Sequence, residues 1–92
     1  MATLVREIDE RARIEEALEP LRLPKGVQLV RFERITDSVG DPAYRFFFSI
    51  PKSYSLEKRA LRALNDVRDQ IFNLLLPLSL DRWPYVRFVE VD

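Results

Sequence analysis

Few groups of side chains in this sequence have the types and the spacing to hold a metal ion. Asp37 and Asp41, with Glu33 nearby, could approach a divalent cation through their carboxylates. Their spacing lacks the D-x-[DN]-x-[DN]-G pattern of a calcium loop. Turn formation explains both aspartates, because an aspartate carboxylate readily accepts a hydrogen bond from a backbone N–H two residues on. We therefore predict no metal site and no bound cofactor.

Candidate nucleophiles are also few. Ser53 and Ser55 lie close to Lys52 and Lys58, and a neighbouring base can activate a serine hydroxyl. Helix capping explains the serines, and solvation explains the lysines. The sequence has no cysteine and no histidine, which excludes disulfides, thiol nucleophiles, structural zinc and histidine-based acid–base schemes. We predict no catalytic residue and no enzymatic activity.

A basic cluster is the strongest nucleic-acid feature of the chain. Its members are Lys52, Tyr54, Lys58, Arg59 and Arg62. Phosphates bind at helix N-termini and an aromatic ring can stack on a base, so RNA or DNA binding here is the alternative to a solvated helix face. Asp66 and Asp69 dilute the charge on the next turns, and the chain has 15 basic and 15 acidic residues. This balance argues against a protein devoted to a phosphate backbone.

Composition indicates one folded domain, placed over residues 1–92. Hydrophobic residues make up 47% of the chain and charged residues 33%, which is typical of a globular protein and not of a disordered segment. No apolar run approaches the roughly 20 residues of a membrane span, and the charged N-terminus is unlike a signal peptide. The absence of cysteine fits a reducing compartment. We therefore expect a cytoplasmic protein.

The centre of the chain predicts the hairpin that the other elements must cover. VQLVRFERIT and AYRFFFSI, within Val27 to Ile50, are rich in β-branched and aromatic residues and flank the loop DSVGDP. Gly40 tolerates positive φ, and Pro42 pushes Asp41 into an extended conformation. We predict a hairpin with a longer loop and positive φ at Gly40.

Matching apolar to apolar residues predicts the register of this hairpin. Phe32 is then opposite Phe48, with Phe46 on the same core face, and Val30 is opposite Ile50. The residues expected on the other face are Arg31, Glu33, Ile35, Arg45, Phe47 and Ser49. Two large apolar residues among charges are not typical of a solvent-exposed face.

Helices are predicted on both sides of the hairpin. The first runs from about Thr3 to Glu19, and the second starts at Ser53 or Ser55 and stops before Pro77. The second has the more regular apolar period, over about half its wheel. The first has two apolar stripes well over 90° apart, which are Leu4, Val5, Ile8 and Ala12, and Ile14, Ala17, Leu18 and Leu21. We expect one stripe to pack on the sheet and the other elsewhere, unless the helix bends.

Tyr85 to Val91, with the sequence YVRFVEV, predicts a third strand at a sheet edge. A strand–helix–strand unit is joined by a right-handed crossover, which places this strand parallel to the one before the helix. The predicted fold class is therefore α+β. The element order is αββαβ, with two helices packed on a three-stranded mixed sheet.

At DSVGDPA followed by FFF, and again at RWPYVRF, the chain resembles small bacterial proteins of about this length that carry a similar GDPA loop before an aromatic strand. The resemblance covers roughly Arg31 to Phe88. That family has no assigned activity. The resemblance therefore supports the fold and transfers no catalytic residue.

These expectations favour a non-enzymatic protein-interaction module, bacterial and cytoplasmic, that is homodimeric or the regulatory member of a two-protein pair. The expected interface residues are Ile35, Phe47, Tyr85, Val89 and Val91. An apolar edge strand and an apolar outer face leave more exposed apolar surface than a soluble monomer usually carries. In the competing arrangement, the end of the first helix and Trp83 fold over the outer face and close it. RNA or DNA binding by the basic cluster is the alternative function.

Overall fold

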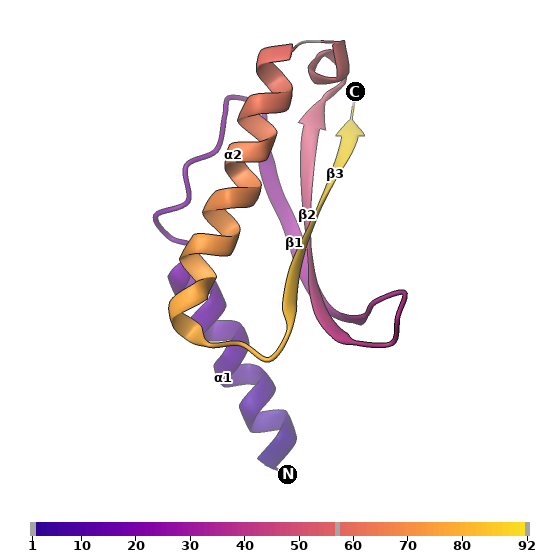
Figure 1. The fold of residues 1–92 in the computed structure, drawn as a ribbon. Coiled ribbons are helices and arrows are strands. Elements are labelled where there is room, and N and C mark those ends of the chain that lie inside the picture. Colours follow the sequence, from indigo (N-terminus) through magenta and orange to yellow (C-terminus); the bar gives the residue numbers. More distant parts are fainter. Residues whose placement is uncertain (1, 57, 92) are drawn as a thin grey trace.

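The computed structural model describes residues 2–56 and 58–91, and the side chains of residues 9–54 and 59–91. Its elements, in chain order, are α1 (Ala2–Ala17), β1 (Gln28–Thr36), β2 (Pro42–Pro51), the 3-10 helix η1 (Lys52–Leu56), α2 (Lys58–Leu75), the 3-10 helix η2 (Leu76–Leu78) and β3 (Trp83–Val91). The two α-helices lie on one side of a three-stranded sheet (Figure 1). The predicted α+β class and the order αββαβ are confirmed.

The sheet is mixed and has the strand order β1-β2-β3. β1 and β2 form the predicted antiparallel hairpin. β3 runs parallel to β2, because the chain crosses the sheet through α2 before it returns. β2 is therefore the central strand, and β3 lies at an edge, as expected.

The predicted hairpin register is wrong by two residues. Phe32 lies opposite Phe46, and Leu29 lies opposite Phe48. Between Leu29 and Arg31 the register shifts at a bulge, and Val30, expected in the core, is 57% exposed. A bulge adds one residue to its strand, so Leu29 takes the core side in place of Val30.

The hairpin loop explains this register. The amide of Asp37 donates to the carbonyl of Asp41 over 2.8 Å, and the amide of Gly40 donates to the carbonyl of Asp37 over 3.0 Å. Gly40 has a φ of 88°, as predicted. The tight loop places Thr36 opposite Pro42. This pair sets the register of the following pairs, from Ile35 opposite Ala43 to Arg31 opposite Phe47.

The core lies between the sheet and the helices. Its buried side chains from β1 and β2 are Phe32, Tyr44, Phe46, Phe48 and Ile50. α2 contributes Leu64, Val67, Ile71 and Leu75, in agreement with its regular apolar period. The Phe32 and Phe46 rings stack with centroids 5.2 Å apart, a geometry that adds to the energy of burial.

α1 packs on the same side of the sheet as α2. It begins at Ala2 and ends at Ala17, slightly earlier at both ends than predicted. Ile14 and Leu18, which begin and extend the second apolar stripe, are buried in the core, whereas Ala12 is exposed. The side chains of Leu4, Val5 and Ile8 lie outside the described residues. The second stripe is therefore the one that packs on the sheet.

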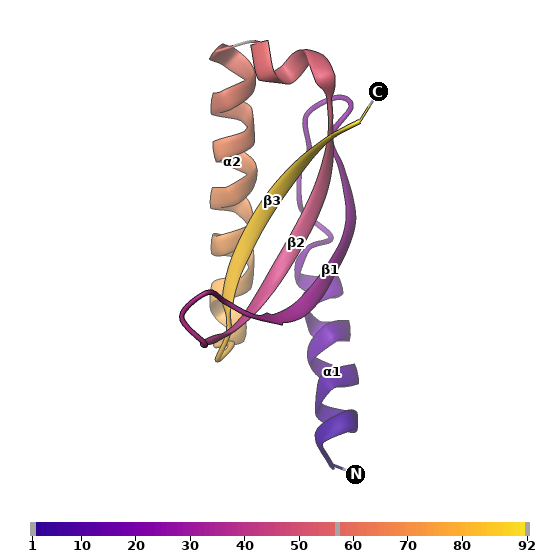
Figure 2. The same ribbon diagram turned by 90° about the vertical axis from the view of Figure 1, so that its right-hand side faces the viewer.

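The competing arrangement, in which α1 and Trp83 close the outer face, is not found. Arg11 of α1 donates to the carbonyl of Phe32 over 3.2 Å, and its guanidinium lies 4.1 Å from the centroid of that ring on the core side. The Trp83 ring lies 5.4 Å from that of Phe72 in α2. Figure 2, which views the outer face of the sheet, shows both helices behind it.

Candidate interaction surface

The outer face of the sheet is basic around a central aromatic ring. Phe47 of β2 is half-buried there, with the guanidinium of Arg31 4.1 Å from its centroid and that of Arg45 6.0 Å away. Arg87 of β3 is its partner in the register. Glu33, the one acidic residue that the described strands place on this face, lies 4.0 Å from Arg31. Stacking two copies face to face would therefore bring like charges together.

Ile35 and Phe47, two of the five expected interface residues, lie on this outer face. Ile35 is half-buried and pairs with Ala43 near the hairpin loop. The arginine side chains over Phe47 cover part of its apolar surface, since a guanidinium stacks favourably on an aromatic face. The outer face is thus a mixed surface and not an exposed apolar patch.

The other three expected interface residues gather on the edge strand. Tyr85, Val89 and Val91 are all exposed. Together with Arg87 they occupy every second position of β3, so their side chains point to the outer side of the sheet. Within the described residues, β3 pairs only with β2. Its second edge therefore presents backbone N–H and C=O groups that another strand can bind.

One flank of α2 continues this apolar surface. Leu61 and Phe72 are eleven residues apart, which is close to three helical turns, so they lie on the same side of α2. Arg68 lies between them, and its guanidinium is 5.2 Å from the centroid of Phe88 in β3. This contact, with that of Phe72 and Trp83, places the part of the flank from Arg68 to Phe72 beside the edge strand. Leu76 extends it at the end of the helix.

We call this surface the open edge and define it by Leu61, Phe72, Leu76, Trp83, Tyr85, Val89 and Val91. Their exposed fractions lie between 39% and 62%. Among the described residues, nine large hydrophobic side chains are exposed, and seven of them belong to the open edge. The other two are Val30 at the bulge and Val39 in the hairpin loop. The exposed large apolar side chains of the described residues thus lie mostly on β3, on α2 and on the 3-10 helix that follows α2.

The predicted interface did not include four residues of the open edge, which are Leu61, Phe72, Leu76 and Trp83. A helix that covers a single core needs an apolar stripe of about 100°, whereas the apolar residues of α2 were seen to fill about half the wheel. This excess width was the available signal. The helical wheel alone could not show which border of the stripe lies beside β3.

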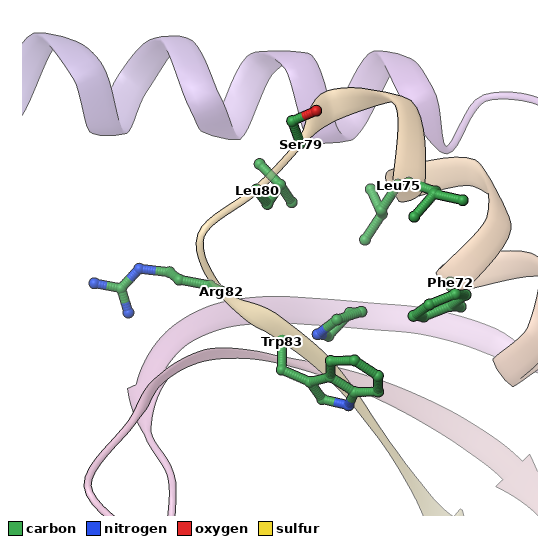
Figure 3. Close-up of a pocket in the computed structure, with 8 residues that line it drawn as sticks. Phe72, Leu75, Ser79, Leu80, Arg82 and Trp83 are labelled. Atoms are coloured by element: carbon green, nitrogen blue, oxygen red, sulfur yellow. The ribbon is translucent and has the colours of Figure 1, made fainter.

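A small apolar cavity lies at the start of the open edge. It has a volume of about 180 Å³, below the roughly 300 Å³ of typical small-molecule sites. It is lined by Phe72, Leu75, Leu76, Ser79, Leu80, Arg82, Trp83 and Pro84. In Figure 3, Leu75, Leu80 and Phe72 face a common hollow, and Arg82 points away from it. The cavity therefore has room for one apolar side chain of a partner.

The hairpin loop is tied to the edge strand by Asp37. Its Oδ1 accepts the amides of Asp41 over 2.9 Å and Val39 over 3.1 Å, and its Oδ2 accepts the hydroxyl of Tyr85 over 3.0 Å. The amide of Asp41 above all, with the other donors, holds the pKa of Asp37 below its ordinary value. The same Asp37 carboxylate raises the pKa of Tyr85. The turn explanation of Asp37 is confirmed, and the bond fixes the position of the Tyr85 ring.

No group of three or more metal-binding side chains occurs in the part of the chain that the structure describes. Elsewhere, the buried hydroxyl of Tyr44 donates to a carboxylate oxygen of Glu10. Burial, with this bond, raises the pKa of Tyr44 to about 12. Tyr44 thus stays neutral and links α1 to β2.

The basic cluster is divided between two elements. Lys52, Ser53 and Tyr54 belong to η1, whereas Arg59 and Arg62 are exposed on α2. The hydroxyl of Tyr54 donates to the carbonyl of Lys25 over 2.7 Å, and its ring packs against the core. The side chains of Ser55 and Lys58 lie outside the described residues. The ring expected to stack on a base is therefore already engaged.

Comparison of the chain with models of known families, with curated proteins and with solved structures gave no match. Among the helices described, none has both the length and the apolar character needed to cross a membrane. The open edge and the outer face are therefore the two surfaces whose geometry points to a function.

Proposed function

We propose that the chain is a non-enzymatic protein-interaction module, which binds a second protein chain through the open edge. The observation that carries this proposal is the concentration of seven of the nine exposed large hydrophobic side chains on that surface. Gatherings of exposed apolar side chains mark interaction sites. The partner is a second copy or the other member of a two-protein pair. The lack of cysteine and the bacterial resemblance support a place in the bacterial cytoplasm.

The mode of binding follows from the elements at the open edge. A free strand edge gains affinity by main-chain hydrogen bonds to an added strand, while pockets for alternate side chains supply specificity. Here the edge strand supplies the hydrogen bonds, and Phe72 with Trp83 borders the cavity that would take a side chain.

Substitution within the open edge tests the proposal. Val89→Lys places a charge on the edge strand, and Val39→Lys is the matched control, because Val39 is 78% exposed outside the open edge. Tagged versions are produced in cells of the source organism, and the extracts are separated by native size. We expect the original chain and Val39→Lys to run in a complex larger than the tagged chain alone, and Val89→Lys to run at the mass of the tagged monomer. An original chain that runs as a free monomer in the extract would contradict the proposal.

A second candidate is binding of single-stranded nucleic acid on the outer face. It is favoured by the Phe47 ring with Arg31, Arg45 and Arg87 around it, since arginines and aromatic rings together bind single strands. Binding of this kind weakens steeply as salt rises. We expect no retention on heparin at about 50 mM salt. Retention that is lost on changing these three arginines to Glu would support the nucleic-acid function, and retention lost on changing Lys58, Arg59 and Arg62 would assign it to the basic cluster.

A further inference from the structure

We propose that the partner at the open edge is a second copy of this chain. Its β3 pairs antiparallel with the first β3, centred on Phe88, so that Arg87 lies opposite Val89 and Tyr85 opposite Val91 of the other copy. The result is one six-stranded sheet with all helices on one side. This inference rests on the proposed function and deepens it by naming the partner and the pairing.

The two edges of the sheet differ in how open they are to another strand. β1 carries the bulge at Val30, and Arg11 of α1 already binds the carbonyl of Phe32. Bulges, charges and covering helices are the usual protection of an edge. β3 has no bulge in its register with β2, and the apolar residues of the open edge lie along it. The added strand is therefore expected at β3.

A second copy can form hydrogen bonds with the free backbone groups of β3 without bringing like charges together. A two-fold axis perpendicular to the sheet pairs the same surface with itself. The outer faces then lie side by side, so Arg31, Arg45 and Arg87 do not face their copies, as they would in a face-to-face stack. Both α2 helices remain on the same side of the joined sheet, and Phe72, whose ring lies 5.4 Å from that of Trp83 at the start of β3, then faces toward the end of β3 of the other copy.

Charge and length select the register. In an antiparallel pair, directly opposite residues point to the same face of the sheet. The two-fold axis can therefore pass between one residue of β3 and the same residue of the other copy, and the pairing is then centred on that residue. Centring on Arg87 would oppose two arginines and include Pro84, which has no N–H to donate. Centring on Val89 would pair only residues 87–91 of the described strand. Centring on Phe88 pairs residues 85–91 of β3 and opposes no like charges.

The helix side of the joined sheet adds opposite charges. Glu90 shares the core side with Ile50, its register partner, and in the proposed pairing it lies opposite Val86 of the second copy. Val86 is two residues from Phe88, over which the Arg68 guanidinium lies 5.2 Å from the ring centroid. Glu90 of each copy therefore approaches Arg68 of the other. Charge complementarity of this kind favours correct register.

Cysteine cross-linking tests the pairing, because the chain has no cysteine of its own. Arg87→Cys and Val89→Cys are purified separately, mixed and oxidised, and the disulfide-linked dimers are identified by mass. Opposite residues of an antiparallel pair have Cα atoms about 4.5–5.5 Å apart, within the range of about 4.4–6.8 Å that a disulfide needs. Residues offset by two are about 7–8 Å apart. We expect the mixed 87–89 dimer to form about tenfold faster than either symmetric dimer.

Tyr85→Cys mixed with Val91→Cys is the second pair, and we expect the same preference there. Circular dichroism and the melting temperature show that each variant folds. Fastest linking of Arg87→Cys to itself would contradict the register.

Sedimentation equilibrium of the purified original chain supplies the independent readout, with a dimer expected at micromolar concentration and a monomer for Val89→Lys. A purified monomer that still joins a complex in cell extract would overturn the homodimer and leave the proposed function standing with another partner.

Discussion

Gly40 gives the clearest residue-scale prediction. Its φ of 88° lies in the left-handed region, which a β-branched side chain adopts only at a cost of about 1–2 kcal/mol. A Cβ there would meet no atom within 4 Å, so this cost is backbone strain alone. We expect Gly40→Val to lower the free energy of unfolding by about that amount, measured by urea denaturation. Gly40→Asn, which tolerates this conformation, should lose less, and equal losses for the two variants would contradict the explanation.

Asp37 predicts how stability depends on pH. Because hydrogen bonds lower its pKa in the folded protein, its contribution is present above the ordinary value of about 3.9. That contribution is lost as the pH falls through the lowered value. We expect the melting temperature to drop as the pH falls below about 4, and to drop less in Asp37→Asn. Parallel curves for the two proteins between pH 6 and 2 would show that other groups cause the loss.

At the scale of the elements, the parts predicted from the sequence were those with one continuous pattern. The apolar period of α2 and the short apolar run of β3 each allow a single assignment, and the crossover rule then orients β3. The hairpin register was different, because alternation is satisfied equally well by pairings two residues apart. Only the hydrogen bonds of the loop at Asp37 decide between them. The pattern of apolar residues in β1 gives no indication of the bulge at Val30.

The candidate surface was predicted in part for a similar reason. Tyr85, Val89 and Val91 could be named because the topology alone makes β3 an edge strand. Phe72 and Leu76 depend on how far α2 is rotated over the sheet, which the sequence does not state. Arg31 and Arg45 were assigned to the outer face, but their stacking on Phe47 depends on side-chain conformation.

α1 carries the element-scale prediction. Ile14 is 0% exposed and joins the core, and truncation of a buried isoleucine costs about 2–5 kcal/mol. We expect Ile14→Ala to lower the free energy of unfolding by that amount, measured by chemical denaturation. Val30→Ala is the matched control at an exposed position, and its effect should stay below about 0.5 kcal/mol. A similar small effect for both would show that α1 is not part of the cooperative fold.

At the scale of the whole molecule, the shape of one copy distinguishes between modes of association. The chain is elongated, with extents of 47 × 29 × 21 Å and a radius of gyration of 14.2 Å, and the start of α1 projects beyond the sheet (Figure 2). Joining two copies at β3 sets their central strands about three strand spacings apart, roughly 14 Å.

Small-angle X-ray scattering measures this arrangement. For the side-by-side dimer we expect a radius of gyration of about 16 Å, only about 2 Å above that of the Val89→Lys monomer. A dimer joined end to end through the projecting helices would exceed about 20 Å, since the long axes would add. That result would move the contact from the edge strand to α1.

The parallel pairing of β2 with β3 also determines when the surface comes into existence. The hairpin of β1 and β2 is local and can form within microseconds, whereas β3 must wait until residues 52–82 have crossed the sheet, and such non-local closure is slow. Trp83, the one tryptophan of the chain, lies opposite Ala43 of β2 in the register of the two strands, so its fluorescence should change when β3 pairs with β2. A refolding chain thus becomes able to recognise its partner only as it completes its own sheet, and association should lag behind the tryptophan signal.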